Sequence, residues 1–483
     1  MLAVESISEI ARSQKEELIA AHAEKAARSF KDYCLFMDHS YEVPRHLAFL
    51  INKLEAVERG DIRRLMISMP PRHGKTETVS KKFPAWFLGR HPEENVILSS
   101  YSFGLVKDFS RNVRNAIESP LYKSVFDITT SLDARAVCDW DIKDHRGGML
   151  AQSVGGAITG YGAHLFVIDD PFKNMQEADS ANMREMVWEW YQSVVLTRLE
   201  PNSRIVLIMT RWNRDDLAGR IMAAEKDWDI INLPALAEAG DILGRLPCEA
   251  LWPERFPAAA LAEKKCKVGT RVWAALFNGN PKDPESQKFS RDWFKMYNEL
   301  PKDIKAKGAG VDTATSLKSS GDNTALCDVY RDAEGFLYVN DLICDKMTVS
   351  AFAKLLINQH AAKHYNNIKL EKNNAGEAFK QRIDEVAREE SVKTGMPVAV
   401  PVECEQTSTD KMVRAMEFQP LVENGTLRFR AGHAKIAELI EHLVNFDGTG
   451  SDIDDDIDAL GFAIKAVMNR NQVEVYVSAH SVY

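Results

Sequence analysis

The chain has 483 residues, of which 45% are hydrophobic and 27% are charged, and its formal net charge at pH 7 is −9. A chain of this length is too long for one ordinary core and predicts two domains of roughly 200 residues or more. The negative charge argues against a broad basic surface for nucleic acid, so any contact with DNA must be local.

The N-terminal region combines a helical pattern with features that argue against membrane targeting. Ala, Glu, Lys and Ile recur at helical spacing from Val4 to Phe36, so residues 1–40 are expected to form a helical prefix. Acidic residues near the N-terminus do not fit a signal peptide, and no run approaches the ~20 apolar residues of a membrane span. We therefore expect a cytoplasmic protein, and seven scattered cysteines without a C-x-x-C pair predict reduced thiols.

Residues 41–285 are expected to form the first domain, in which strand-like apolar runs alternate with helical stretches. This alternation predicts an α/β fold, with a parallel sheet and helices on both of its faces. The strands are expected at Leu65 to Met69, Asn95 to Ser99, Leu165 to Ile168 and Arg204 to Met209, and the helices at Phe103 to Glu118 and Asn182 to Arg198.

The most informative motif of this domain ends in Gly74-Lys75-Thr76, between a strand and a helix expected from Glu77 to Phe87. At such a turn, backbone N–H groups cradle the phosphates of a nucleoside triphosphate. Lys75 would reach the β- and γ-phosphates, and the Thr76 hydroxyl would bind Mg²⁺. Met69 replaces the first glycine of the usual pattern, so the loop by itself is an incomplete signal. The residues expected to bind ATP are Arg72, His73, Gly74, Lys75 and Thr76.

A second motif, two carboxylates at the end of an apolar strand, supports the first. The run His164 to Ile168 leads into Asp169 and Asp170, which is how a magnesium-binding aspartate is presented beside a phosphate loop. Asp169 would hold Mg²⁺, and Asp170 would orient or deprotonate the attacking water. Glu177 stays open as the alternative for this second carboxylate. Without the phosphate loop, the two aspartates could equally cap a strand end.

Turn-forming residues from Asn278 to Ser286 mark the expected boundary, after which residues 286–470 form a second domain and residues 471–483 a tail or an added edge strand. Short turns join the first three strands of this domain, so we expect an antiparallel meander that later helices cover. The strands are expected at Gly308 to Thr313, Thr324 to Tyr330, Phe336 to Ile343, Lys369 to Glu371 and Val398 to Val402.

Acidic residues follow the strands of the second domain and open its last helix. Asp312 and Glu371 each end an apolar strand, so both can project into one cleft from adjacent strands. Asp454, Asp455 and Asp458 stand at a helix start, which directs at least two of them the same way. Clustered carboxylates repel unless a cation neutralises them, and Mg²⁺ or Mn²⁺ matches this all-oxygen set. Two such ions about 4 Å apart activate water for phosphodiester cleavage.

The acidic run from Asp452 to Asp458 has two other interpretations. A solvated loop at a helix N-terminus, where the helix dipole favours acids, accounts for the run taken alone. A calcium loop does not fit, because Ile457 takes the place of the required glycine and Ala463 that of the required glutamate.

Taken in order, these motifs resemble the large terminase subunit of tailed double-stranded DNA bacteriophages, a motor ATPase fused to a ribonuclease H-like nuclease. The match spans nearly the whole chain, and the joint order of the motifs is more specific than any one of them. Two positions depart from the family pattern, Glu371 where many relatives have aspartate and Ile453 where histidine often precedes the acidic pair. The matching segments are Pro70 to Thr76, Thr159 to Gly162 with Ile168 to Lys173, Met209 to Trp212 with Asp215 to Leu217, Leu251 to Arg255, Asn280-Pro281, Val311 to Ala314, Gly321 to Thr324, Glu371 to Asn373 and Asp454 to Leu460.

The resemblance implies a P-loop NTPase domain followed by a ribonuclease H-like nuclease domain. It implies a viral DNA-packaging motor, in which ATP hydrolysis drives double-stranded DNA into the procapsid and a two-metal endonuclease cuts concatemeric DNA at initiation and termination. Arg72 would contact the γ-phosphate and promote hydrolysis with Asp170, and Thr210 with Arg211 would couple hydrolysis to movement of DNA.

The resemblance also implies the cofactors, ATP with Mg²⁺ in the first domain and two Mg²⁺ or Mn²⁺ in the second. The segment Pro44 to His46 would lie near the adenine, and Lys411 would either approach the nuclease site or be an ordinary surface charge. Mg²⁺ would bind Thr76 and Asp169, and the nuclease metals would bind Asp312, Glu371, Asp454 and Asp455, with Asp458 in support.

The implied partners are double-stranded DNA, the portal protein, the small terminase subunit and further copies of the chain in a ring of five on the procapsid. The protein would act in the cytoplasm of the infected bacterial host, docked transiently on the procapsid and absent from the mature virion. A helicase-like repair ATPase fused to a nuclease is the alternative enzyme, but it needs helicase motifs beyond Trp212, where we find none. A non-enzymatic DNA-binding packaging adaptor with decayed sites is a further alternative, although all the key side chains are present.

Overall fold

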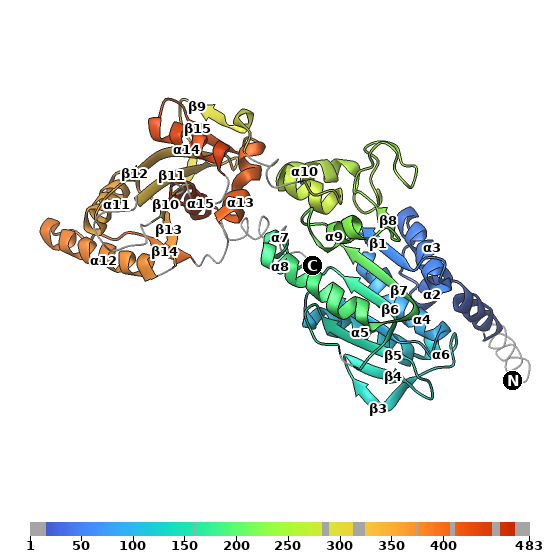
Figure 1. Ribbon diagram of the computed structural model, residues 1–483. Helices are drawn as coiled ribbons and strands as arrows, with labels where there is room; N and C mark the ends of the chain where they lie inside the picture. Colours follow the sequence, from blue (N-terminus) through green and yellow to red (C-terminus); the bar gives the residue numbers. More distant parts are fainter. Residues whose placement is uncertain are drawn as a thin grey trace, which may run out of the picture. The chain divides into compact units, whose positions relative to one another are not determined.

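The computed structural model describes residues 16–158, 160–282, 289–312, 324–372, 374–405, 411–446 and 455–468. These residues form two units that divide between residues 282 and 283, and residues 263–271 group with the second unit. Each unit has one sheet between two layers of helices (Figure 1), which confirms the expected α/β class. Within the described ranges, no helix is both long and apolar enough to cross a membrane. All seven cysteines are free.

The sheet of the first unit has eight strands in the order β3-β4-β5-β2-β6-β7-β1-β8. The six strands from β5 to β8 in this order pair in parallel, as the alternating pattern predicts. Strands β3 and β4 add an antiparallel edge that the sequence analysis did not predict. The strands are β1 Arg64–Ser68, β2 Val96–Ser100, β3 Thr130–Ala136, β4 Asp139–Ile142, β5 Gly148–Ser153, β6 Ala163–Asp169, β7 Leu199–Met209 and β8 Asp229–Asn232.

Two apolar cores, one on each face of this sheet, hold the helices in place. The expected helical prefix is helical at residues 16–28 and again in α2, and the rest of its start lies outside the described residues. One face carries α2 Phe30–Met37, α3 Arg45–Arg59, α4 Phe83–Arg90, α5 Phe103–Glu118 and α6 Pro120–Lys123, and the other carries α7 Met175–Asp179, α8 Ala181–Trp190 and α9 Leu217–Ala224. Shorter turns of helix are η1 Glu77–Lys82, η2 Tyr191–Val195, η3 Leu196–Arg198 and η4 Trp273–Phe277, and α10 is Ala258–Val272.

Glu118 at the end of α5 anchors the antiparallel edge of this sheet. Its Oε1 accepts hydrogen bonds from the Thr129 hydroxyl at 2.9 Å, from the Thr130 N–H at 2.9 Å and from the Thr130 hydroxyl at 2.6 Å. Burial raises the pKa of Glu118, but the hydrogen bonds outweigh it and lower the pKa to about 2. The ionised carboxylate therefore stabilises the junction between α5 and β3.

The sheet of the second unit has seven strands in the order β14-β13-β10-β11-β12-β15-β9. Strands β10, β11 and β12 form the expected antiparallel meander. The strand expected at Val398 to Val402 is wrong, because the strand begins only at Val402. Pro401 has no N–H to pair, and the Val402 N–H bonds back to the Val400 carbonyl instead. The strands are β9 Lys295–Tyr297, β10 Ile304–Asp312, β11 Thr324–Asp332, β12 Leu337–Asp345, β13 Asn367–Glu371, β14 Val402–Glu405 and β15 Leu427–Arg430.

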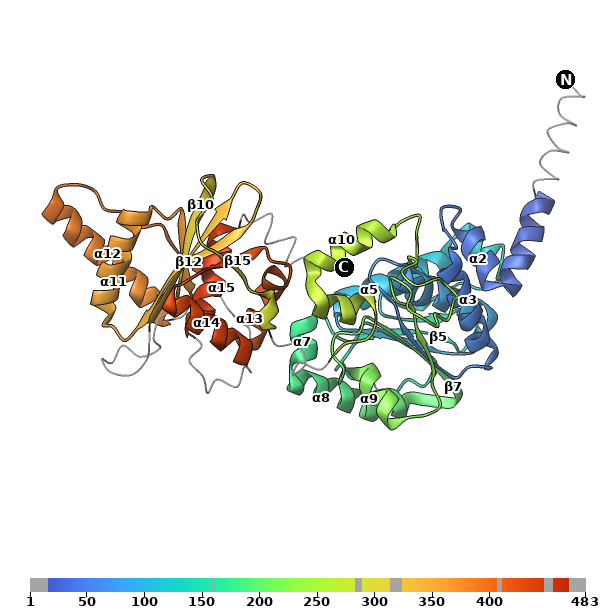
Figure 2. The same ribbon diagram turned by 90° about the horizontal axis from the view of Figure 1, so that it is seen from above.

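Helices cover both faces of the second sheet, as Figure 2 shows, and each face again has its own apolar core. One face carries α11 Val349–Lys363 and α12 Asn374–Thr394, and the other carries α13 Lys411–Glu423, α14 Ala434–Asn445 and α15 Asp455–Val467. A short helical turn, η6 Arg291–Trp293, precedes β9.

Two glycines let α15 lie directly on the middle of this sheet. A Cβ on Gly310 would lie 2.0 Å from the Ala459 carbonyl oxygen and 2.2 Å from the Ala463 nitrogen, and a Cβ on Gly308 would lie 2.8 Å from the Ala466 Cβ. Any side chain at Gly310 therefore overlaps the helix backbone. This close approach carries the acidic N-terminal turn of α15 to the end of β10.

Candidate functional site

The phosphate loop lies where the sequence predicts it, between β1 and a helix that begins at Lys75. Gly74 has a φ of 89° and Arg72 a φ of 65°, so both have a left-handed backbone. Glycine adopts this conformation freely, whereas it strains an arginine, and such strain clusters where a loop is shaped for a ligand. A Cβ on Gly74 would lie 2.9 Å from a Leu47 methyl carbon, and Arg72 is exposed.

Asp169 is buried at the end of β6 and faces the first turns of the helix after the loop. Its Oδ2 accepts a hydrogen bond from the Ser80 hydroxyl at 2.6 Å, and its Oδ1 lies 3.4 Å from the Thr76 hydroxyl. Burial and the charge of Asp170 raise the pKa of Asp169 to about 7, although Lys75 lowers it. A divalent cation stabilises a carboxylate that is costly to ionise, so Thr76 and Asp169 fit a Mg²⁺ site.

Ser80 is a contact that the sequence analysis missed. It follows Thr76 by four residues, so both hydroxyls lie on one face of the helix and reach the same carboxylate. The sequence could have indicated this contact, because Ser80 places a hydroxyl one helical turn after the phosphate-loop threonine.

The Lys75 ammonium joins groups from the ends of two neighbouring strands, β6 and β7. It lies 3.0 Å from Asp170 Oδ1 and 2.9 Å from Oδ2, and it donates to the Thr210 hydroxyl. Thr210 follows β7, which lies between β6 and β1, and its N–H donates to Asp170 Oδ1 at 2.6 Å. The Lys75 side chain is only 7% exposed. The expected phosphate-binding lysine, the catalytic candidate and the coupling threonine therefore form one network.

Glu177, the alternative catalytic carboxylate, contacts its own helix start instead. Its Oε2 accepts a hydrogen bond from the Lys173 N–H at 2.9 Å, and its N–H donates to Asn174 at 2.9 Å. The structure thus brings Asp170 to Lys75, and Glu177 caps the region before α7.

Arg211, the second expected coupling residue, forms a buried ion pair at the start of α9. Its Nε lies 2.9 Å from both carboxylate oxygens of Asp216, whose side chain is fully buried. Burial raises the pKa of Asp216, and Arg211 opposes that shift. Asp216 also caps α9 by accepting from the Gly219 N–H at 3.0 Å. The Thr210-Arg211 pair therefore connects the Lys75 network to a helix.

An aromatic wall that the sequence analysis did not predict supports the phosphate loop. The His73 ring centre lies 4.7 Å from that of Phe256, and the His46 ring centre lies 5.3 Å from that of Trp252. His46 Nε2 donates to the His73 carbonyl at 2.9 Å, and burial lowers the pKa of His46. The segment Pro44 to His46, expected near the adenine, thus places a buried, neutral histidine against the loop backbone.

In the second unit, Asp312 and Glu371 end two neighbouring parallel strands, β10 and β13. The register pairs Val311 with Leu370, so the next residue on each strand stands at the same edge of the sheet. Val311 and Leu370 pack in the core on the α11 and α12 side. Alternation along a strand therefore puts Gly310, Asp312 and Glu371 on the opposite face, which α15 covers.

The first turn of α15 adds Asp455 and Asp458 to these two carboxylates. Burial and the charges of Asp458, Asp455 and Glu371 raise the pKa of Asp312 well above its usual range. Mutual repulsion of this kind is relieved by hard divalent cations, so the carboxylates fit the chemistry of a metal site. Asp454, the adjacent expected ligand, lies outside the described residues. Among those described, no three acidic, histidine or cysteine side chains are close enough together to hold a metal ion.

Asp458 is bound by Arg414 of α13, a residue that the sequence analysis did not single out. Arg414 Nε lies 2.9 Å from Asp458 Oδ1, and Nη2 lies 2.6 Å from Oδ2. Lys411, expected by resemblance near this site, lies one helical turn before Arg414. The neighbouring Asp456 points elsewhere, because its Oδ2 lies 2.6 Å from Nδ1 of His442 on α14.

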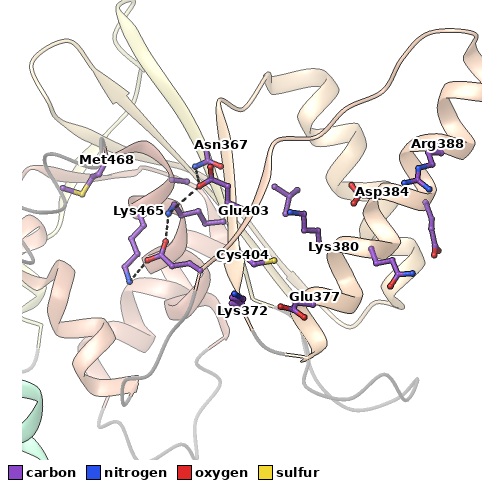
Figure 3. A pocket seen from close by; sticks show the side chains of 16 residues that line it. Asn367, Lys372, Glu377, Lys380, Asp384, Arg388, Glu403, Cys404, Lys465 and Met468 are labelled. Atoms are coloured by element: carbon purple, nitrogen blue, oxygen red, sulfur yellow. Dashed lines mark hydrogen bonds and ion pairs between the residues drawn. The ribbon is translucent and has the colours of Figure 1, made fainter.

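A polar groove of about 1290 Å³ lies beside β13, between β14, α12 and the end of α15 (Figure 3). Its lining includes five basic and five acidic side chains, so it is not a uniformly basic surface. Lys465 is 3.5 Å from Glu405, which also pairs with Lys369. Burial raises the pKa of Cys404 within the groove, and the charges of Lys380 and Lys372 oppose that shift. The basic side chains of the lining are Lys369, Lys372, Lys380, Arg388 and Lys465.

Comparisons with known proteins agree with both halves of this description. A family profile described as "Terminase large subunit, T4likevirus-type, N-terminal" matches residues 66–296, and one described as "Terminase RNaseH-like domain" matches residues 309–466. A crystal structure of the large terminase from a thermophilic bacteriophage aligns with a TM-score of 0.50 at 10% identity, over 86% of this chain and 98% of that chain. No curated protein matches the sequence.

Two further solved structures align less well. The HK97 bacteriophage large terminase aligns at 13% identity with a TM-score of 0.32, over 87% of this chain and 94% of that chain. The large terminase nuclease from thermophilic phage G20c aligns at 12% identity with a TM-score of 0.27, over 37% of this chain and 96% of that chain. At these identities the likeness concerns the fold alone, and of these three structures only the first supports it.

The two folds define a class of enzyme, an ATPase domain followed by a ribonuclease H-like nuclease domain. With both family profiles matched in order, the chain belongs to the terminase large subunits, the ATPases and nucleases of phage DNA packaging. The helicase-like and non-enzymatic alternatives are thereby set aside.

Proposed function

We propose that Arg72 to Thr76 and Asp169 bind ATP with Mg²⁺, and that Asp170 is the carboxylate that activates water. The convergence of Asp170 and Thr210 on the buried Lys75 ammonium carries this proposal. In this arrangement Lys75 neutralises Asp170, so a nucleotide phosphate must replace Asp170 as the partner of Lys75. Asp170 is then released to accept a proton from water, as a general base does. Arg72 is exposed within the loop, so its side chain is free to reach a bound phosphate.

Thr210 and Arg211 are proposed to transmit the state of the nucleotide. Thr210 bonds both Lys75 and Asp170, so a change of either partner alters the backbone at the end of β7. Arg211 is the next residue, and its buried pair with Asp216 holds the start of α9. The chain of contacts from the phosphate loop to α9 is thus continuous, and a coupling role is the function that it supports.

For the nuclease, we propose that Asp312, Glu371, Asp454 and Asp455 bind two Mg²⁺ or Mn²⁺ ions. When bound, such ions would supply a nucleophile at neutral pH and stabilise the leaving oxygen of a phosphodiester, and Mg²⁺ held by Thr76 and Asp169 would neutralise phosphate charge. The protein's own contribution is to hold carboxylates from β10, β13 and α15 at one sheet edge. Lys372 and Lys380 in the adjacent groove would contact the phosphates of the DNA strand, a local contact that the negative net charge permits.

We further propose the partners and place of action that the family implies. Five copies form a ring on the portal of the procapsid, with double-stranded DNA and a small terminase subunit as further partners. They act in the cytoplasm of the infected host without entering the mature virion. The ATPase activity belongs to residues 41–285 and the nuclease activity to residues 286–470, in keeping with the separate family matches to residues 66–296 and 309–466.

Two substitutions in the full chain separate the two activities. Lys75→Ala should abolish ATP hydrolysis yet leave metal-dependent plasmid cleavage, and Asp312→Ala should do the reverse. Lys81→Ala is the control for the first, because Lys81 pairs at the helix surface with Glu77 at 3.0 Å. Loss of neither activity in the first two variants would overturn the site assignment.

A further inference from the structure

Arg414 holds Asp458 through two parallel hydrogen bonds, one to each carboxylate oxygen, at 2.9 and 2.6 Å. The side chains are only 17% and 9% exposed. A bidentate arginine–carboxylate pair of this kind is strong and geometrically specific, and an arginine does not lose its proton in a protein. Asp458 therefore has a permanent cationic partner on both of its oxygens.

The pair belongs to the acidic cluster of the nuclease. Asp458 follows Asp455 by three residues, so the two carboxylates lie on one face of α15. The close packing of α15 on Gly310 brings that face to the end of β10, where Asp312 stands. Burial lowers the pKa of Arg414, but the charges of Asp458, Glu371 and Asp312 outweigh burial and raise it. Arg414 in turn lowers the pKa of Asp312. The guanidinium is thus a fixed positive charge within the cluster.

We propose that Arg414 is a positioning residue of the nuclease: it withholds Asp458 from metal coordination and acts as a built-in counter-ion for the remaining carboxylates. This inference rests on the proposed nuclease site, and it revises the supporting metal role that the resemblance gave to Asp458. A cation that binds Asp312, Glu371 and Asp455 must do so against the field of Arg414. The arginine therefore keeps the carboxylates ordered and limits their affinity for metal.

The test is the dissociation constant of Mn²⁺ for the full-length chain without ATP, measured by the electron paramagnetic resonance signal of free Mn²⁺. Binding that is lost in Asp312→Ala belongs to the nuclease site. Arg414→Gln should tighten this binding by about tenfold or more, because a unit charge a few ångströms away is removed and a carboxylate is freed. Arg414→Lys, which keeps the charge, should bind Mn²⁺ within about threefold of wild type by the same electrostatic reasoning.

Two further variants isolate the cause. Arg414→Gln combined with Asp458→Asn removes one charge of each sign, so Mn²⁺ affinity should return towards the wild-type value. Arg382→Gln makes the same change of net charge in a surface ion pair of α12, 2.9 Å from Glu385, and should have no effect. A circular-dichroism melt of each variant confirms that the second unit remains folded.

The outcomes are distinct. Weaker or unchanged Mn²⁺ binding in folded Arg414→Gln, as a purely structural anchor would give, overturns the counter-ion role. Binding that stays tight in the double variant overturns the part assigned to Asp458. If wild-type protein shows no Mn²⁺ binding that depends on Asp312, the proposed metal site fails, and the failure lies there rather than with Arg414.

Discussion

Gly310→Ala should disable the nuclease by adding a single methyl group at a residue that is not itself a proposed metal ligand. The new Cβ would lie 2.0 Å from the Ala459 oxygen, 2.2 Å from the Ala463 nitrogen and 2.7 Å from the Phe462 carbonyl carbon, all of them backbone atoms of α15. Backbone cannot turn aside as a flexible side chain can. The helix must therefore retreat until the closest contact reaches about 3.4 Å, a shift of about 1.4 Å.

The shift moves Asp455 away from Asp312, because both depend on the contact between α15 and β10. A misplacement of about 1 Å costs a catalytic site on the order of a hundredfold in rate, so cleavage should fall at least that much. Overpacking should also cost about 1–3 kcal/mol of stability. The assay is the initial rate of Mn²⁺-dependent plasmid cleavage, with a thermal melt, and ATP hydrolysis by the same preparation reports on the first unit.

Gly461→Ala is the matched control, since Gly461 lies on the same helix and its Cβ would meet nothing closer than a Phe418 ring carbon at 3.9 Å. Alanine inside a helix is favoured over glycine, so this variant should keep its activity and gain about 0.5–1 kcal/mol of stability. Wild-type cleavage by Gly310→Ala, or equal damage from Gly461→Ala, would refute the reasoning.

Three further predictions concern other parts of the chain. At pH values above its ordinary pKa of 4.5, the ionised Glu118 stabilises the first unit, and this contribution is lost as the pH falls towards its folded pKa of about 2. The stability deficit of Glu118→Gln in thermal melts should therefore shrink below pH 4.5 and vanish near pH 2. A deficit that is independent of pH would contradict this prediction. Thr210→Val removes the hydroxyl that accepts a hydrogen bond from Lys75. This change should slow ATP hydrolysis by about tenfold or more while binding of a fluorescent ATP analogue persists. Unchanged turnover would exclude Thr210 from the network. Lys372→Glu in the groove should raise the KM for plasmid cleavage and lower the salt dependence of KM. The control, Lys393→Glu at the exposed end of α12, should do neither. Equal effects of the two substitutions would mean that DNA does not bind in the groove.

Local patterns predicted the strand ends of both sites because parallel neighbours finish at the same sheet edge. Asp169 and Asp170 follow one apolar run, and Asp312 and Glu371 follow two others, so each pair needs only the strand assignment to be brought together. The strand expected at Val398 to Val402 failed because its apolar residues suited a strand while Pro401 prevented the pairing. The antiparallel edge formed by β3 and β4 was missed because its sequence mixes charges with few apolar residues.

The amino-acid sequence alone determined the order of the motifs, the α/β class and the carboxylates at the strand ends, because these depend on periodicity and on residues close in the chain. The tertiary structure alone decided which charges meet. Arg414 finds Asp458 across 44 residues, Asp456 turns to His442, and Lys75 joins Asp170 to Thr210. Such partners depend on how closely a helix packs on a sheet, and α15 packs closely because Gly310 has no side chain. Local sequence patterns do not predict this packing distance.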